Sequence, residues 1–520
     1  MLAAFAAGLL LAAAFPAPNI SLCAWIVPGL MLWICCEKNG RLQFRIAYCA
    51  GLGRWVGSIY WLLYIPFHVH AIAGFVALAA VLASFTAAWC WMCLKLLGPR
   101  DGLFPERLKR ATVGHQLLWP LMCAAAWVAI EMGTARVFTG FPWNILGASQ
   151  YRFLPLIQIS SFTGVYGVSL LVVWSSVGLV TAIALRNSIR RASLPILPPL
   201  LASIAAVIYG QRTLAAPETA STKIKIALVQ PSIPQPTIWD ANEKTNRFLK
   251  LVDLSKQALE KSPDILVWPE AAMPDIFTRN KFTQHIISQL VTSKKCWMVM
   301  GASDSRPKPN GAPAELEWAN SAFLINPAGE LVSRYNKKHL VVFGEYMPLA
   351  NIFPFLGKLR SSGAGLASGS RDVFFTTSNP RAHFPAVICY EDMFPHEVRD
   401  RVDAETDFIL NLTNDGWFGD SNVQWQHAIN ALFRAIENGI PLVRCTNNGL
   451  TCWIDSHGNI HETFFENTMD IHQAGWKIAE VPLRSHDQPP TFYTKHGDIL
   501  GWTCVAITAV LLPLFASKRH

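Results

Sequence analysis

The chain has 520 residues, of which 52% are hydrophobic and only 15% charged, and its formal net charge is +9. Such an apolar composition excludes an ordinary soluble protein of this size and indicates residence in a membrane. The positive charge does not indicate nucleic-acid binding, because the basic residues stand mainly in short loops between apolar runs and form no basic stripe or recognition motif.

Eight apolar segments are candidates for membrane-spanning helices, which predicts a polytopic α-helical membrane domain. A run of about 20 apolar residues crosses a bilayer as a helix because a helix satisfies its own backbone hydrogen bonds where water is absent. The first two segments are shorter than this. The opening run lacks a basic flank, so we expect it to be retained as a helix and not cleaved as a signal peptide. The expected spans are residues 2–15, 22–36, 45–64, 71–97, 116–138, 157–185, 194–209 and 499–515.

Loop charges predict the orientation of these helices. Basic residues near helix ends tend to stay on the cytoplasmic side of a membrane. They follow every even-numbered span, for example at Arg41, Lys95, Arg190 and Lys518. We therefore expect both termini in the cytoplasm. The long segment between spans seven and eight then lies on the opposite side, which is the periplasm of a Gram-negative cell.

Residues 223–484 have the pattern of a separate α/β domain. Short β-type runs such as KIKIALVQ, DILVWPE and AVICYED alternate with helical stretches there. We expect membrane helices 1–7 in residues 1–215, the α/β domain in 223–484 and membrane helix 8 in 495–516.

The twelve cysteines are scattered and predict neither a disulfide framework nor a metal site. Eight of them lie in or beside apolar runs, where a free cysteine packs as a small hydrophobic residue. Cys90 and Cys93 form a CxxC, but no second pair or histidine cluster stands at zinc spacing. We interpret this pair as structural.

Three short sequences of the α/β domain place a reactive residue at the end of an apolar strand. They are Glu270 in LVWPEAAMP, Lys337 in YNKKHLVVFGEYMP and Cys389 in AVICYEDMF. A thiolate is a competent nucleophile, and a nearby carboxylate can act as its base. A lysine ammonium can stabilise the oxyanion of a tetrahedral intermediate. Lys338 is the rival to Lys337 for this role because the two lysines are adjacent.

In this order the three residues resemble the Glu–Lys–Cys triad of the nitrilase superfamily. The resemblance covers roughly residues 223–484 and implies an αββα sandwich. It implies that Glu270 is the general base, Lys337 the oxyanion stabiliser and Cys389 the nucleophile.

Supporting residues are expected around this triad. The resemblance suggests Glu345 as a second glutamate that orients the lysine or the substrate. Glu391 and Tyr390, which follow Cys389 directly, are expected to support the same site. A structural ion pair is the alternative for each glutamate.

Further sequences resemble the apolipoprotein N-acyltransferases, and this likeness extends over nearly the whole chain. They are WVAIEMGTARVFTGFPWNILGASQY, WDANEK, FGEYMPL and LTNDGWFG. The resemblance implies that Cys389 takes a fatty acyl chain from the sn-1 ester of a phospholipid, typically phosphatidylethanolamine. The acyl chain then passes to the α-amine of the S-diacylglyceryl cysteine of an apolipoprotein. No cofactor or metal is implied, and we expect a monomer in the bacterial inner membrane with its catalytic domain in the periplasm.

Aromatic side chains are expected to form the substrate pocket. The resemblance suggests Trp239 and Trp417 as pocket walls, with Phe418 in the same apolar loop. The loop at residues 351–359 is expected to dip into lipid or to gate the pocket.

Two charged residues within the expected membrane helices, Arg54 and Glu131, require an explanation because an ionised group in hydrocarbon is costly unless paired or hydrated. We expect them to face the bundle interior or a cleft filled by a lipid headgroup, with Arg136 as a possible third member. A purely structural ion pair is the alternative.

Two other functions fit part of the pattern. A membrane-bound amidase or nitrilase would use the same triad to hydrolyse a small amide, with water as the acceptor. A non-enzymatic binding or transport protein would tolerate replacement of Cys389.

Overall fold

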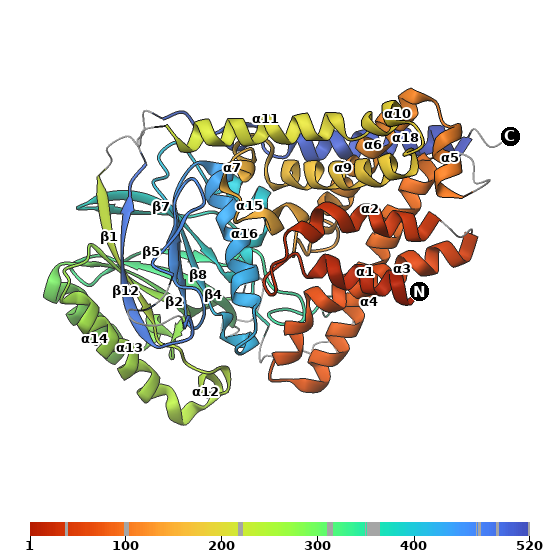
Figure 1. The fold of residues 1–520 in the computed structure, drawn as a ribbon. Coiled ribbons are helices and arrows are strands. Elements are labelled where there is room, and N and C mark those ends of the chain that lie inside the picture. The colour runs from red at the N-terminus through yellow and green to blue at the C-terminus, as the bar shows by residue number, and fades with distance from the viewer. Residues whose placement is uncertain are drawn as a thin grey trace. The chain divides into compact units, whose positions relative to one another are not determined.

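The structure is a computed structural model, and it divides into two compact units (Figure 1). The first unit comprises Met1–Leu63, Ala71–Pro217 and Thr491–His520, and the second comprises Tyr64–His70 and Glu218–Pro490. The expected gating loop at 351–359 lies outside the described residues. The described residues are 1–36, 40–97, 103–216, 222–308, 316–348, 350, 365–463, 465, 470–484 and 488–517.

The first unit is helical. Four of its segments are long and apolar enough to cross a membrane: His68–Leu96, Val113–Thr134, Val165–Ala184 and Ile189–Leu214. Its helices are α1 (Leu2–Ala12), α2 (Leu22–Cys36), α3 (Gly40–Ser58), η1 (Tyr60–Tyr64), α4 (His68–Leu96), α5 (Phe104–Arg110), α6 (Val113–Thr134), η2 (Leu146–Gln150), α7 (Leu154–Ile157), α8 (Ser160–Thr163), α9 (Val165–Ala184), α10 (Ile189–Ser193), α11 (Leu197–Leu214), α17 (Phe492–His496) and α18 (Ile499–Ser517).

The expectation of eight spanning helices is supported for four of them, and the other segments differ for identifiable reasons. At 11 residues, α1 is about 16 Å long, roughly half of the hydrocarbon thickness of about 30 Å. The helix α3 carries three arginines and has a low mean hydropathy for a span. One of the four supported spans, expected over residues 157–185, is interrupted at Gly164, whose φ of +66° ends α8 before α9 begins.

Helix α9 lies at the centre of this unit, where it packs against α2, α6, α11 and α18. Most of its side chains are buried, including Tyr166 and Val172. Small residues bring other helices close together. A Cβ at Gly53 of α3 would lie 2.0 Å from the carbonyl oxygen of Phe5 in α1, so only glycine permits this crossing.

The second unit contains two six-stranded sheets. The strand order is β12-β1-β2-β3-β4-β5 in the first sheet and β11-β10-β9-β8-β7-β6 in the second. Each sheet has three parallel strands at its centre, β1-β2-β3 and β7-β8-β9, and antiparallel strands outside them. The strands are β1 (Lys223–Gln230), β2 (Ile265–Met273), β3 (Trp297–Pro307), β4 (Leu316–Ile325), β5 (Leu331–Asn336), β6 (Phe374–Ser378), β7 (Arg381–Ile388), β8 (Ile409–Thr413), β9 (Leu442–Thr446), β10 (Cys452–Ile454), β11 (Ile460–His461) and β12 (Gly475–Pro482).

The two sheets pack face to face and are covered by helices, which gives the expected α/β sandwich. One apolar core joins the sheets through alternate residues such as Ile226 of β1 and Ala386 of β7. A second core lies between the first sheet and helices α13 and α14. Figure 1 shows these two helices on one side of the strands and α15 and α16 on the other. The helical elements are α12 (Gln235–Trp239), η3 (Ala241–Glu243), α13 (Lys244–Leu259), η4 (Phe277–Arg279), α14 (Lys281–Lys294), η6 (Cys389–Met393), α15 (Pro395–Asp400), η7 (Asp415–Phe418) and α16 (Val423–Asn438).

Candidate active site

Glu270 lies where β2 becomes irregular. The pairing of β2 with β3 shifts in register between Trp268 and Met273, and Ala271 has a φ of +49°. Irregularities of this kind redirect side chains next to active sites. On β3, a Cβ at Gly301 would lie 2.2 Å from the carbonyl oxygen of Pro269, so glycine is required for this close approach. The Glu270 side chain is buried, with 7% of its surface exposed.

Lys337 follows β5 directly and is almost completely buried. Its backbone N–H donates to the carbonyl of Asn320 on β4 (2.8 Å), which fixes the chain as it leaves the sheet. The ammonium donates to Glu345 Oε1 (2.8 Å) and lies 3.4 Å from Glu270 Oε1. Lys337 is thus an ammonium held between two carboxylates.

Cys389 follows β7 of the other sheet and begins the 3₁₀ turn η6. Its φ of +51° is a conformation that costs a non-glycine residue free energy and that recurs at active sites. The side-chain amide of Asn411 donates to its carbonyl oxygen (3.3 Å). Glu270 and Lys337 both act electrostatically on the Cys389 thiol, so the two sheets bring all three predicted residues together.

Glu345 and Asn320 complete the polar surroundings of the triad. Asn320 donates from Nδ2 to Glu270 Oε1 (2.7 Å) and is 3.4 Å from Glu345 Oε1. The other oxygen of Glu345 accepts from the backbone N–H of Val341 (2.8 Å). Glu345 therefore contacts the Lys337 ammonium, whereas Asn320 contacts the carboxylate of Glu270. Asn320 carried no sequence signal, because an asparagine inside a strand has no distinctive spacing.

The charges at the site determine its protonation state. Burial raises the pKa of Glu270, although Lys337 opposes this effect. Burial and the Glu270 carboxylate raise the pKa of the Cys389 thiol well above its ordinary value. Burial alone would lower the pKa of Lys337, but Glu345 and Glu270 outweigh it and raise that pKa. The resting site therefore holds Cys389 as a thiol and Lys337 as an ammonium.

Lys338, the rival lysine, points to a different place. Its ammonium pairs with Asp372 at 2.8 Å, and both side chains are about one-third exposed. Only its backbone N–H reaches toward the site region, where it donates to Glu391 (2.9 Å). The geometry favours Lys337 for contact with a reacting carbonyl.

Glu391 joins the loop that follows Lys337 to the turn that begins at Cys389. It is fully buried and accepts hydrogen bonds from the backbone N–H groups of Lys338 (2.9 Å) and Ile388 (2.7 Å) and from the Tyr335 hydroxyl (2.7 Å). Its carboxylate also pairs with Arg401 (3.0 Å). Burial would raise the pKa of Glu391, but Arg401 and these hydrogen bonds lower it. Glu391 is thus a permanent anion that positions both segments.

Tyr390 and the expected pocket aromatics lie in two groups. The Tyr390 ring packs edge-on against Phe394, with centroids 5.1 Å apart. The Trp239 ring lies 5.3 Å from that of Trp417 and 5.0 Å from that of Phe67. Trp239 is 42% exposed, so this cluster presents an aromatic surface to its surroundings. Phe418 ends the short turn η7 that carries Trp417.

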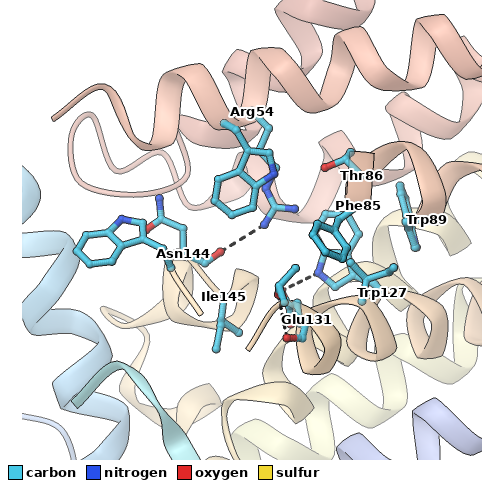
Figure 2. A pocket seen from close by; sticks show the side chains of 12 residues that line it. Arg54, Phe85, Thr86, Trp89, Trp127, Glu131, Asn144 and Ile145 are labelled. Carbon is cyan, nitrogen blue, oxygen red and sulfur yellow. Dashed lines mark hydrogen bonds between the residues drawn. The ribbon is translucent and has the colours of Figure 1, made fainter. Parts of the chain in front are cut away.

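Arg54 and Glu131 line one internal cavity of the first unit, of about 20 Å³ (Figure 2). The guanidinium lies 4.8 Å from the ring centroids of Trp55 and Trp127 and donates to the Asn144 carbonyl (3.3 Å). Glu131 Oε1 accepts from Trp127 and from the backbone N–H of Leu146, both at 2.8 Å.

This cavity decides between the expectations for the two charged residues. A volume of about 20 Å³ admits a water molecule but no lipid headgroup. Arg136 is not a third member, since it pairs with Asp498. The headgroup-filled cleft is therefore not what the structure shows, and both residues face the interior of the helical unit.

Sequence reasoning also missed a buried group of charges close to Cys389 in the structure. His427 and Arg444 both contact Asp392 and Asp415. The two aspartates stand in the sequences CYEDMF and LTNDGWFG, but the partners come from a helix and a strand far along the chain. Among the residues that the structure describes, no group of three His, Cys, Asp or Glu side chains has the arrangement of a metal site.

Comparison with protein families matches two parts of the chain. Residues 7–178 match the model of the apolipoprotein N-acyltransferase N-terminal domain, and residues 225–481 match that of the carbon-nitrogen hydrolases. The second match assigns the sandwich to the nitrilase-like fold.

Curated relatives match over most of their length. An apolipoprotein N-acyltransferase of Geobacter metallireducens is 33% identical over 100% of this chain and 95% of its own. One of Rickettsia prowazekii is 31% identical over 89% of this chain and 87% of its own. A solved amidase from Nesterenkonia sp. is 16% identical, with a TM-score of 0.37 over 51% of this chain and 92% of its own.

Proposed function

This chain belongs to the apolipoprotein N-acyltransferases and N-acylates lipoproteins, and we propose that it does so through a thioester on Cys389 with Glu270 as base and Lys337 as oxyanion stabiliser. The observation that carries the proposal is the contact geometry. Lys337 Nζ lies 3.4 Å from Glu270 Oε1, and both charged groups act electrostatically on the Cys389 thiol.

In the first half-reaction the Cys389 sulfur attacks the sn-1 ester carbonyl of a phospholipid, for which we propose phosphatidylethanolamine. The thiol proton passes to Glu270 as the C–S bond forms. The ester C–O bond then breaks, and the proton on Glu270 goes to the departing lysophospholipid hydroxyl. A base with a raised pKa suits a thiol with a raised pKa, because the proton then moves between groups of more similar affinity.

In the second half-reaction the α-amine of the S-diacylglyceryl cysteine of an apolipoprotein attacks the thioester. Glu270 accepts the amine proton, the C–S bond breaks and the Cys389 thiolate is reprotonated. Lys337 stabilises the oxyanion of both tetrahedral intermediates. Its nearly complete burial strengthens this effect, since an ammonium acts more strongly where water does not screen it.

The membrane setting supports acyl transfer over hydrolysis. The chain is a membrane protein with four segments able to cross a bilayer. We propose that the shorter apolar helices also enter the inner membrane, giving about eight helices, with both termini cytoplasmic and the sandwich in the periplasm. Both lipid-anchored substrates are then within reach of a monomer. An alkaline phosphatase fusion after Pro482 that is active in cells supports this orientation, and an inactive one contradicts it.

Product analysis tests the function against the rival amidase. The purified chain is supplied with phosphatidylethanolamine and a diacylglyceryl lipopeptide. We expect N-acylated lipopeptide and lysophospholipid in equal amounts, and no product from Cys389→Ala. Release of free fatty acid with an unmodified lipopeptide would overturn the proposal, because water would then be the acceptor.

A further inference from the structure

Four buried charged side chains form a closed ring behind the nucleophile, and we refer to Asp392, Asp415, His427 and Arg444 as the charge ring. His427 Nε2 lies 2.8 Å from Asp392 Oδ1, and its Nδ1 lies 2.8 Å from Asp415 Oδ1. Arg444 donates from Nη1 to Asp392 Oδ2 (2.6 Å) and from Nη2 to Asp415 Oδ2 (2.9 Å). All four side chains are at least 95% buried.

This geometry specifies the protonation of His427. Both ring nitrogens face carboxylate oxygens, and a neutral imidazole would turn a lone pair toward one of them. The histidine is therefore an imidazolium, and the two cations of the ring balance its two carboxylates. The groups that face it come from three elements: Asp392 from η6, Asp415 from η7 and Arg444 from β9.

The charge balance persists at neutral pH. Burial lowers the pKa of His427 and Arg444 opposes its protonation, but Asp392 and Asp415 outweigh both and raise that pKa to about 9. Burial raises the pKa of Asp415, whereas His427 and Arg444 lower it below its ordinary value. Each charge in the ring therefore depends on the others.

The ring holds the backbone of the nucleophile turn. Asp392 is part of the same 3₁₀ turn as Cys389, three residues further on. Arg444 Nη1 also donates to Asn411 Oδ1 (3.3 Å), and Asn411 in turn donates to the Cys389 carbonyl (3.3 Å). These contacts hold the backbone of Cys389 in its conformation of positive φ.

The ring also reaches the sulfur atom. Thr413 Oγ1 donates to Asp415 Oδ1 (3.2 Å), and the same threonine lowers the pKa of the Cys389 thiol, whereas Asp415 raises it. A threonine hydroxyl has one proton to donate. Because His427 and Arg444 already donate to Asp415, that proton is available to a thiolate when one forms.

We propose that His427 is a positioning residue for the acyl transfer. Its permanent positive charge, together with that of Arg444, neutralises Asp392 and Asp415 behind Cys389 and thereby favours the Cys389 thiolate. The inference rests on Cys389 as the nucleophile of the proposed function. It assigns to a buried residue of α16 an influence on the charge of the reacting sulfur. The thiol proton itself still passes to Glu270.

The proposal predicts shifts of opposite sign for two partners in one hydrogen bond. His427→Gln leaves the ring with a net charge of about −1 and disfavours the thiolate, whereas Asp415→Asn leaves it at about +1 and favours the thiolate. The double variant restores neutrality.

Alkylation of Cys389 by iodoacetamide reports how much of the thiol is present as thiolate. It is carried out on the full chain in detergent across a pH series, and the modified peptide is quantified by mass spectrometry. We expect the profile of His427→Gln to move to higher pH, with roughly tenfold slower alkylation at neutral pH, which corresponds to about one pH unit. Asp415→Asn should move the profile to lower pH, and the double variant should return toward the wild type.

His461→Gln is the matched control, since His461 pairs with Asp455 (3.2 Å) at the edge strand β11 and is half-exposed. It should leave the profile unchanged. Shifts in the same direction for the two single variants, or no shift in either, would overturn the proposal. If His427→Gln does not fold, the downward shift of Asp415→Asn still decides the matter. The readout is the thiol itself, so a failure to accept phospholipid would refute the proposed function without affecting this result.

Discussion

Two adjacent lysines differ completely in their surroundings. Lys337 is enclosed by Glu270 and Glu345, whereas Lys338 pairs with Asp372 at the surface. The sequence shows only two adjacent lysines, and the pattern around them left both as candidates for the oxyanion stabiliser. The difference arises because consecutive residues leaving a strand point in opposite directions, so the register of β5 against β4 decides which lysine enters the site.

Replacement of each lysine tests this assignment. Lys337→Gln removes the charge opposite the developing oxyanion, and we expect the rate of acyl transfer to fall by about 10²–10³-fold. Lys338→Gln is the matched control and should keep the rate within about twofold, because its ammonium contributes only a surface ion pair. Rates are measured with saturating lipopeptide. Equal losses in the two variants would contradict the assignment.

The pH dependence of acyl-enzyme formation reports on Glu270. The base must be ionised to accept the thiol proton, and its pKa is raised from the ordinary value of 4.5. We therefore expect the rate to fall as the pH is lowered, with an acid limb centred above 4.5. In Asn320→Leu the base loses a hydrogen bond that lowers its pKa, so the limb should move to higher pH. An acid limb unchanged in this variant would contradict the role of Asn320.

At the scale of elements, the ends of strands β2, β5 and β7 carry the three residues of the site, and a glycine contact beside β2 allows its chain to pass close to β3. The apolar runs of β2 and β7 and the order of the reactive residues were predictable from the sequence, because buried strands have a distinctive composition. The irregularity of β2 and the positive φ of Cys389 could not be predicted from the sequence, since they depend on pairing with strands far along the chain. The break between α8 and α9 was missed for a related reason. Hydropathy does not register a single glycine whose backbone ends a helix.

The contact between α1 and α3 gives a test at this scale. Gly53→Ala places a methyl group against the Phe5 carbonyl, and we expect a loss of about 1–3 kcal/mol in the free energy of unfolding. Gly74→Ala in α4 is the control, since a Cβ there has no neighbour within 4 Å, and helix propensity predicts a gain of up to about 1 kcal/mol. Thermal unfolding in detergent ranks the variants. Equal melting temperatures would contradict the close crossing.

At the scale of the whole molecule, two parts of the chain were recognisable from different signals. The sandwich was predictable from the three sequences that carry its reactive residues, and the helical part from its apolar composition. The number of spanning helices was not predictable, because α1 and α2 are shorter than a typical span and α3 contains three arginines. The charge ring was invisible for another reason. Its members are spread over residues 392–444, and only the fold brings them together.

The central claim is that Cys389 carries the acyl group between the two substrates. Intact-mass measurement of the purified chain after incubation with phosphatidylethanolamine tests this claim most directly. We expect the wild-type mass to increase by one fatty acyl group, the lipopeptide acceptor to remove this increase, and Cys389→Ala to show none. A wild-type chain that transfers acyl groups without ever acquiring the added mass, or an adduct that persists in Cys389→Ala, would contradict the account.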